Sequence, residues 1–196
     1  MIIKYYEANK ISLDENKFLL FYGKNDGHKT EITENLIKSR QNILTYEEKE
    51  ILDNSNDFIE SLISKSLFES EKIIIIKRAT DKILKIFENI ISKNINDLNI
   101  IINADNLEKK SKLRTYFEKD KKFVCVAFYP DNEQTLFKLA YNFLKGKKIP
   151  ISSSNLNLIV AKCNGDREKL INELIKVEYY SRAGKKITSE SISKLT

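Results

Sequence analysis

The chain has 196 residues, of which 41% are hydrophobic and 32% charged, so it can bury a sizeable core and does not belong to the disordered class. Five glycines and two prolines exclude collagen-like and low-complexity chains, two cysteines exclude a disulfide framework, and no apolar run approaches the roughly 18 residues of a membrane span. The net charge of +6 permits contact with nucleic acid without demonstrating it, and the N-terminus lacks a secretory signal, so we expect a cytoplasmic protein with no membrane partner.

Short apolar runs alternate with helical patterns through the first two thirds of the chain. Each run is too short for a helix, and its continuous apolar character predicts a strand that is buried on both faces. The predicted strands are Phe18–Tyr22, Ile73–Ile76, Leu98–Ile102 and Phe123–Phe128, with Ile43–Tyr46 as a further strand at an edge.

Helical periodicity occurs between these strands. The predicted helices are one containing Phe58, Ile59, Leu62 and Ile63, a second over Asp81–Ser92 with Thr80 as its N-cap, and a short basic one over Lys109–Lys119. This alternation predicts an α/β fold, a parallel sheet with helices on both faces.

The pattern changes at Pro130, after which only helices are predicted. Their expected start signals are Asp131, which can form a capping box with Gln134, then Ser152, the turn Asn164–Asp166, and Thr188. We therefore expect two domains, an α/β domain over residues 1–140 and a small helical domain over residues 141–196.

The first predicted strand is followed by a partial match to a phosphate-binding loop. Such a loop has Gly, four residues, then Gly-Lys-Ser/Thr, and Gly23, Lys29 and Thr30 stand at matching positions. His28 replaces the second glycine, and Gly27 falls one position early. Because that glycine lets the backbone approach phosphate without a side chain, we expect a degenerate loop.

The carboxylates that should accompany a working loop are also missing. An ATPase needs an acidic pair at the end of a later strand, but the strand over Leu98–Ile102 continues into Asn103, Ala104 and Asp105. His28 is the only histidine, and Cys125 and Cys163 have no partner motif, so no triad or metal site is indicated. We predict no catalytic residues, no metal and no cofactor, and favour a binding or mechanical role.

An apolar pair in a polar setting is the remaining feature of note. Leu67 and Phe68 follow Ser66 and precede the acidic Glu69. One interpretation places both side chains in the core. The other has them project as an anchor for a partner's pocket, where such a pair can act as a binding hot spot.

Taken in order, several segments resemble the delta subunit family of the bacterial DNA polymerase III clamp loader. The matching segments are Phe18–Gly23, Ser66–Phe68 with Lys72–Arg78, Ala104-Asp105, Lys110–Arg114 with Phe117–Lys119, Tyr129–Asp131, Gly165–Arg167, Leu170–Leu174 and Lys176. The resemblance implies an AAA+-type α/β domain with a helical lid, followed in the family by a helical collar. We expect this chain to be a truncated form or fragment that lacks the collar.

The resemblance also implies a function. In the family, delta does not hydrolyse ATP; it binds the ring-shaped sliding clamp (the beta subunit) and opens it for loading onto DNA during replication. The implied partners are the clamp, the other clamp-loader subunits and, through the assembled complex, DNA. The chain itself is expected to be inert within the DNA polymerase III holoenzyme, a nucleotidyltransferase.

Site residues carry over at a few positions. Leu67 and Phe68, with Ser66, fall on the family's clamp-anchoring segment, which favours the anchor interpretation. No Gln precedes Leu67 by a few residues, so we expect a folded helix tip rather than an extended peptide to present the pair. Arg167 falls where related motor subunits keep a nucleotide-sensing arginine; without a competent loop, we expect it to have a structural role.

Two other functions stay open from the residues alone. The first is an active P-loop ATPase of the same fold. The second is a basic DNA-binding protein that uses the stretch Lys109–Lys122.

Overall fold

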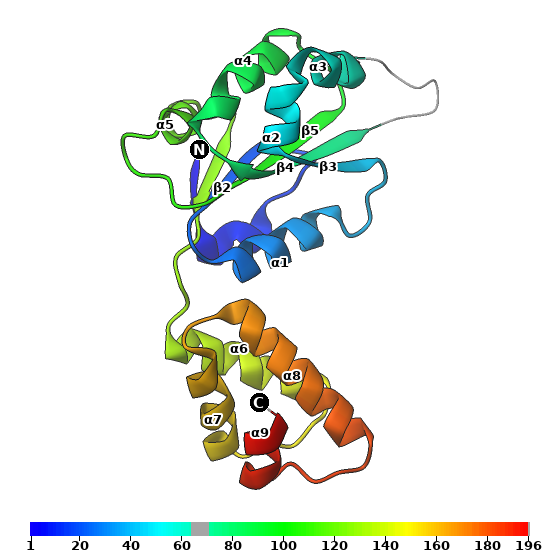
Figure 1. Ribbon diagram of the computed structural model, residues 1–196, viewed down its shortest axis with the longest axis vertical. Helices are drawn as coiled ribbons and strands as arrows, with labels where there is room; N and C mark the ends of the chain where they lie inside the picture. Colours follow the sequence, from blue (N-terminus) through cyan, green and yellow to red (C-terminus); the bar gives the residue numbers. More distant parts are fainter. Residues whose placement is uncertain (64–70, 196) are drawn as a thin grey trace. The chain divides into compact units, whose positions relative to one another are not determined.

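The computed structural model describes residues 1–63 and 71–195 (Figure 1). Contacts within the chain divide it into two units: Met1–Lys24 with Lys29–Tyr129, and Asn25–His28 with Pro130–Thr196. The division after Tyr129 coincides with the change of sequence pattern at Pro130. The boundary at residue 140 expected from sequence lies inside a helix, α6 (Glu133–Gly146).

The first unit contains a parallel sheet, which confirms the predicted fold class. Within the described residues the sheet has six strands in the order β1-β6-β2-β5-β4-β3, and every neighbouring pair is parallel. The strands are β1 (Ile2–Lys4), β2 (Phe18–Tyr22), β3 (Ile43–Glu47), β4 (Lys72–Ala79), β5 (Leu98–Ala104) and β6 (Val124–Ala127). All five predicted strands are present, and β3 forms one edge.

Helices cover both faces of this sheet (Figure 1). The 3-10 helix η1 (Tyr5–Lys10) and α1 (Asp26–Ile37) pack on one face. The other face carries α2 (Glu48–Asp53), α3 (Ser55–Ile63), η2 (Asp81–Ile83), α4 (Leu84–Ser92) and α5 (Lys112–Lys119).

The central strands are buried on both faces, as their continuous apolar runs predict. In β4, Ile74 and Ile76 join the core beneath α2–α5, whereas Ile73 and Ile75 join the core beneath η1 and α1. None of the four is more than 5% exposed. Each such side chain contributes about 1.5–3 kcal/mol through its removal from water, so the sheet is a large source of stability in this unit.

The second unit consists of helices around a separate apolar core. Its helices are α6, α7 (Ser153–Cys163), α8 (Arg167–Arg182) and α9 (Ser189–Leu195). The buried core residues are Leu136, Ala140, Leu144, Ile149, Leu156, Ile159, Val160, Cys163, Leu170, Leu174, Val177 and Ile192. No helix in the described part of the chain is long and apolar enough to cross a membrane.

Most predicted helix starts are confirmed by their capping bonds, and one is wrong. The Ser152 hydroxyl accepts a hydrogen bond from the Asn155 amide at 3.2 Å, and the Thr188 hydroxyl accepts one from Ser191 at 3.2 Å. Asp131 does not cap α6. Asn132 does, accepting from the Thr135 amide at 2.8 Å, which leaves the Asp131 carboxylate available for another partner.

Several elements differ from the sequence-based prediction. Strand β1 and helices α1 and α2 were not predicted. The basic helix begins at Lys112 rather than Lys109, because the Ser111 hydroxyl accepts from the Arg114 amide at 3.2 Å and so acts as N-cap. The predicted helix Asp81–Ser92 is confirmed as η2 followed by α4, and Thr80 caps η2.

Both cysteines are buried, and this determines their reactivity. Burial raises the pKa of the Cys125 thiol to about 12, and burial also raises the pKa of the Cys163 thiol. Because the thiolate is the reactive form, we expect neither cysteine to react with Ellman's reagent in the folded protein at mildly alkaline pH, and both to react after denaturation. Fast labelling of the folded protein would contradict this.

The raised pKa of Cys125 also sets a direction for stability against pH. The unfolded thiol ionises near 9.0 and the folded one near 12, so the folded state retains a proton that the unfolded chain releases. This contribution to stability is complete below pH 9 and is lost as the pH rises toward 12. Denaturation in a pH series should show the loss in the parent protein and a smaller one in Cys125→Ala.

Candidate functional site

The candidate phosphate loop starts at Gly23, directly after β2 in the first unit. Gly23 has a φ of +117°, and a Cβ at this position would lie 2.2 Å from the Phe128 carbonyl oxygen. Its amide donates to the Asp105 carbonyl at 3.1 Å, while the Phe128 amide donates to Tyr22 at 2.7 Å. The backbone of Gly23, just after β2, therefore lies beside that of Phe128, just after β6, too closely for any side chain.

The lysine of the loop is held by the protein itself. Lys29 is only 4% exposed, and its Nζ donates to the carbonyl of Ala104 at the end of β5 at 2.7 Å. In a working P-loop this amine reaches the β- and γ-phosphates. Thr30, which would hold magnesium, is exposed.

The strand end beside Lys29 carries a carboxamide where a carboxylate is needed. The Asn103 Oδ1 atom is buried and has no hydrogen-bond partner among the described residues. A neutral amide cannot serve as the base that activates water, and it adds no negative charge to hold a cation. The residues Lys29, Thr30 and Asn103 therefore do not fit Mg-ATP. No cluster of His, Cys, Asp and Glu that could hold a metal occurs in the part of the chain that the structure describes.

The middle of the loop, Asn25–His28, belongs to the second unit. Asn25 Nδ2 donates to Asp131 Oδ2 at 2.9 Å, and the His28 amide donates to Asn25 Oδ1 at 3.1 Å. A Cβ on Gly27 would lie 2.9 Å from the Glu168 amide nitrogen, so the start of α8 is in close contact with this segment. His28, at the position of the missing glycine, is buried.

Arg167, the sensor-like residue, forms a buried ion pair in the same unit. Its Nη1 donates to both carboxylate oxygens of Asp131, at 3.1 and 3.2 Å. The side chains of Arg167 and Asp131 are only 9% and 2% exposed. Asp131 therefore joins Asn25 and the start of α8 instead of capping α6.

The predicted clamp-binding residues Ser66, Leu67 and Phe68 lie outside the described residues. The described chain on either side is held by side-chain contacts. Lys72, at the start of β4, donates from Nζ to the Ser61 carbonyl in the last turn of α3 at 2.8 Å.

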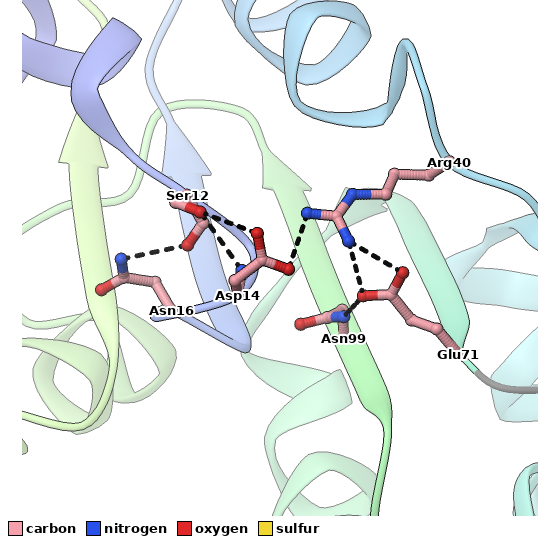
Figure 2. A network of polar contacts seen from close by, with 6 residues as sticks. All are labelled: Ser12, Asp14, Asn16, Arg40, Glu71 and Asn99. Atoms are coloured by element: carbon pink, nitrogen blue, oxygen red, sulfur yellow. Dashed lines mark hydrogen bonds and ion pairs between the residues drawn. The ribbon is translucent and has the colours of Figure 1, made fainter.

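Glu71 is part of a polar network at the amino ends of the strands (Figure 2). Arg40 Nη1 contacts Glu71 Oε2 at 3.1 Å, and Arg40 Nη2 contacts Asp14 Oδ1 at 2.8 Å. Asn99, in β5, donates to Glu71 Oε1 at 2.7 Å. Hydrogen bonding to Asp14 raises the pKa of Arg40. Since the strands are parallel, this network lies at the opposite edge of the sheet from Gly23.

The sequence did not reveal the partners of Asp131, Arg167 and Glu71. Asp131 and Arg167 both lie in segments that carry the family resemblance, and their opposite charges were the available signal. The pairing itself spans 36 positions and could not be inferred without the fold. For Arg40, Glu71 and Asn99, no sequence pattern indicated a network.

The chain is similar in sequence to one protein family and similar in fold to several solved structures. The sequence model of the family described as DNA polymerase III, delta subunit, matches residues 19–127. No curated protein sequence matches the chain.

Three solved structures illustrate the fold. Domain III of the Thermotoga maritima replication initiation protein DnaA is similar with a TM-score of 0.61 at 16% identity, over 97% of this chain and 88% of that one. The Bacillus subtilis DNA clamp loader delta protein has a TM-score of 0.61 at 15% identity, over 98% of this chain and 61% of that one. The RuvB Holliday junction branch migration motor of T. maritima has a TM-score of 0.62 at 13% identity, over 97% and 67%. These likenesses confirm the expected AAA+-type fold.

The buried ion pair leads to a prediction about stability. Asp131→Ala should lower the free energy of unfolding by about 3 kcal/mol, because it leaves the buried Arg167 charge without its carboxylate. Arg167→Ala should have a similar effect, and the double variant should lose clearly less than the sum of the two. Urea denaturation of the full chain measures all three.

Glu168→Ala is the matched control, since Glu168 is the exposed neighbour of Arg167 in the first turn of α8. It should leave stability within about 0.5 kcal/mol of the parent chain. Additive losses in the Asp131 and Arg167 variants would show that the two side chains do not act as a pair.

Proposed function

Because this chain belongs to the DNA polymerase III delta subunit family, we propose that it acts as a clamp-loader subunit that binds a ring-shaped sliding clamp and opens the ring for loading onto DNA. The family match, which covers more than half of the chain, is the observation that carries the proposal. The similar B. subtilis protein is described as a DNA clamp loader delta protein, and this chain spans 61% of it. The proposed partners are the sliding clamp and the other clamp-loader subunits, in the cytoplasm.

Ring opening needs no covalent chemistry from this chain. It needs differential binding, in which the subunit holds an opened or strained ring interface better than a closed one. The geometry of the phosphate loop supports such a non-catalytic role. The Lys29 amine is bound to Ala104, and Asn103 stands where a carboxylate would be needed.

We assign clamp binding to Leu67 and Phe68, with Ser66 beside them in the sequence. The support is the sequence: two large apolar residues between polar neighbours, in a segment that resembles the family's anchor. The described residues that flank the segment are tied down. Lys72 is bonded to Ser61, and Glu71 is bonded to Arg40 and Asn99. Force on the anchor would therefore pass directly into β4, a buried strand.

One observation favours a second candidate function. Lys109, Lys110, Lys112 and Lys119 are exposed in and before α5, which suits the alternative of direct DNA binding through Lys109–Lys122. A DNA affinity that is strong without the clamp and is lost when these lysines are replaced would support it.

The anchor assignment is tested by replacing Leu67 and Phe68 with alanine together. At about 25 cal/mol per Å², the loss of a few hundred square ångströms of contact costs several kcal/mol, or at least about a hundredfold in affinity. Binding to the cognate clamp is measured by surface plasmon resonance, and thermal unfolding is followed in parallel. The double variant should keep the parent melting temperature and lose the clamp.

Leu158→Ala is a suitable control for that experiment, because Leu158 is a leucine of the second unit with 42% of its surface exposed. It should bind the clamp as the parent chain does. If the Leu67/Phe68 variant unfolds, the pair belongs to the core. If it stays folded and binds tightly, the grip lies elsewhere.

The inert loop is tested by calorimetry with Mg-ATP. We expect no turnover and no binding in the low micromolar range. His28→Gly restores the loop glycine but leaves Lys29 bonded to Ala104 and Asn103 uncharged, so this variant should also fail to bind. Tight binding of Mg-ATP to the parent chain would instead favour the alternative of an active ATPase.

A further inference from the structure

The second unit carries a cationic surface that the proposed clamp-opening role does not use. Residues 141–150 and 179–186 contain six Lys or Arg and no Asp or Glu, although the whole chain has 34 basic and 28 acidic residues. The six are Lys145, Lys147, Lys148, Arg182, Lys185 and Lys186. We call this set the basic end of the second unit.

Folding brings the two segments together. Lys147 Nζ, just after α6, lies 3.2 Å from Glu178 Oε1, and Arg182 Nη2, in the last turn of α8, lies 2.6 Å from the same oxygen. The C-terminal end of α6 and the last turns of α8 are therefore neighbours. Glu178 is only 8% exposed, so its carboxylate presents little negative charge to the surface.

A hollow of about 430 Å³ opens beside these cations. Tyr141, Lys145 and Lys148 line it, together with apolar residues of which Ile149 and Pro150 are two. Tyr141 is 49% exposed, and the Lys145 amine lies 5.6 Å from the centre of its ring. The hollow thus combines an exposed aromatic ring, an apolar lining and two ammonium groups.

Helix electrostatics explain only part of this arrangement. Cations in the last turn of a helix interact favourably with its free carbonyl groups, which accounts for Lys145 and Arg182. Lys148, Lys185 and Lys186 lie beyond the helix ends and are exposed. Helix electrostatics also do not account for exposed aromatic rings at this end of the unit. Tyr179, which follows Glu178 in α8, is 68% exposed.

We propose that the basic end of the second unit binds single-stranded nucleic acid. The lysines contact successive phosphates, and an unpaired base stacks on the Tyr141 ring over the apolar lining of the hollow. A duplex keeps its base faces stacked internally and can use only the cations, so the ring favours a single strand. This inference does not depend on clamp binding, because none of these residues belongs to the proposed anchor, Ser66–Phe68.

The test is fluorescence anisotropy of a labelled oligo(dT) titrated with the full chain, without clamp. Lys145→Ala/Lys148→Ala should weaken binding about tenfold at moderate salt and reduce the slope of log affinity against log salt by about 1.4, as expected for two lost phosphate contacts. The matched control is Lys85→Ala/Lys93→Ala, which removes the same charge from exposed positions of the first unit outside the Lys109–Lys122 stretch.

Stacking is tested separately at Tyr141. Tyr141→Ala should weaken oligo(dT) binding by about fivefold or more and leave the binding of a duplex unchanged. Tyr141→Phe retains the ring and should bind the oligonucleotide as the parent chain does. Melting temperatures should stay at the parent value in all variants, because the substituted side chains are exposed.

Several results would overturn the proposal. The first is an equal loss in the Lys145/Lys148 and Lys85/Lys93 variants, which would show non-specific attraction to net charge. The second is an unchanged affinity in Tyr141→Ala. The third is competition by poly-glutamate as effective as that by unlabelled oligo(dT), which would indicate an acidic protein partner.

Discussion

A parallel sheet cannot leave either face to water, and this constraint organises the first unit. Each connection between parallel strands must cross a face, so helices cover both, and the strands between them become apolar throughout. Ile73–Ile76 in β4 show the result, with side chains in two separate cores. Polar side chains therefore gather at the two borders of the sheet that are formed by the ends of the strands. The candidate phosphate loop follows the carboxyl end of β2, at the border here called the carboxyl edge. The network around Glu71 lies at the amino ends of the strands, here called the amino edge.

The two edges differ in what their polar groups can do. At the carboxyl edge, the Lys29 amine donates a hydrogen bond to the Ala104 carbonyl, and Asn103 contributes a neutral side chain. At the amino edge, Arg40 joins the chain before β2 to the start of β4 through two carboxylates. An AAA+-type fold is therefore present with a loop unsuited to nucleotide chemistry and with firm attachment of the strand that follows the proposed anchor. This combination agrees with the non-catalytic role proposed above.

Elements fixed by their own residues were predictable from sequence, and elements fixed by distant partners were not. Apolar runs defined the central strands, and the hydroxyls of Ser152 and Thr188 marked helix starts through bonds to nearby amides. Strand β1 has three residues and pairs with β6, more than a hundred positions away. Helix α1 has only one fully buried apolar residue, Ile32, so its sequence shows little periodicity. Asp131 is of a residue type that commonly caps helices, but its carboxylate pairs with Arg167, and Asn132 caps α6 instead. For the candidate site, the phosphate loop and its departures from the motif were predictable from sequence. The hydrogen bonds of Lys29 to Ala104 and of His28 to Asn25 were not.

The close approach of the Gly23 and Phe128 backbones bears on how sequence motifs are interpreted. The first glycine of a phosphate-loop pattern is usually counted as evidence for nucleotide binding. Here the residue is required because a side chain would collide with the Phe128 carbonyl and because its φ is +117°. Any chain in which the ends of these two neighbouring strands approach so closely needs a glycine at that position, whether or not it binds a phosphate. The first glycine therefore indicates only the fold. The residue at the His28 position is the one that indicates whether the loop can bind a phosphate.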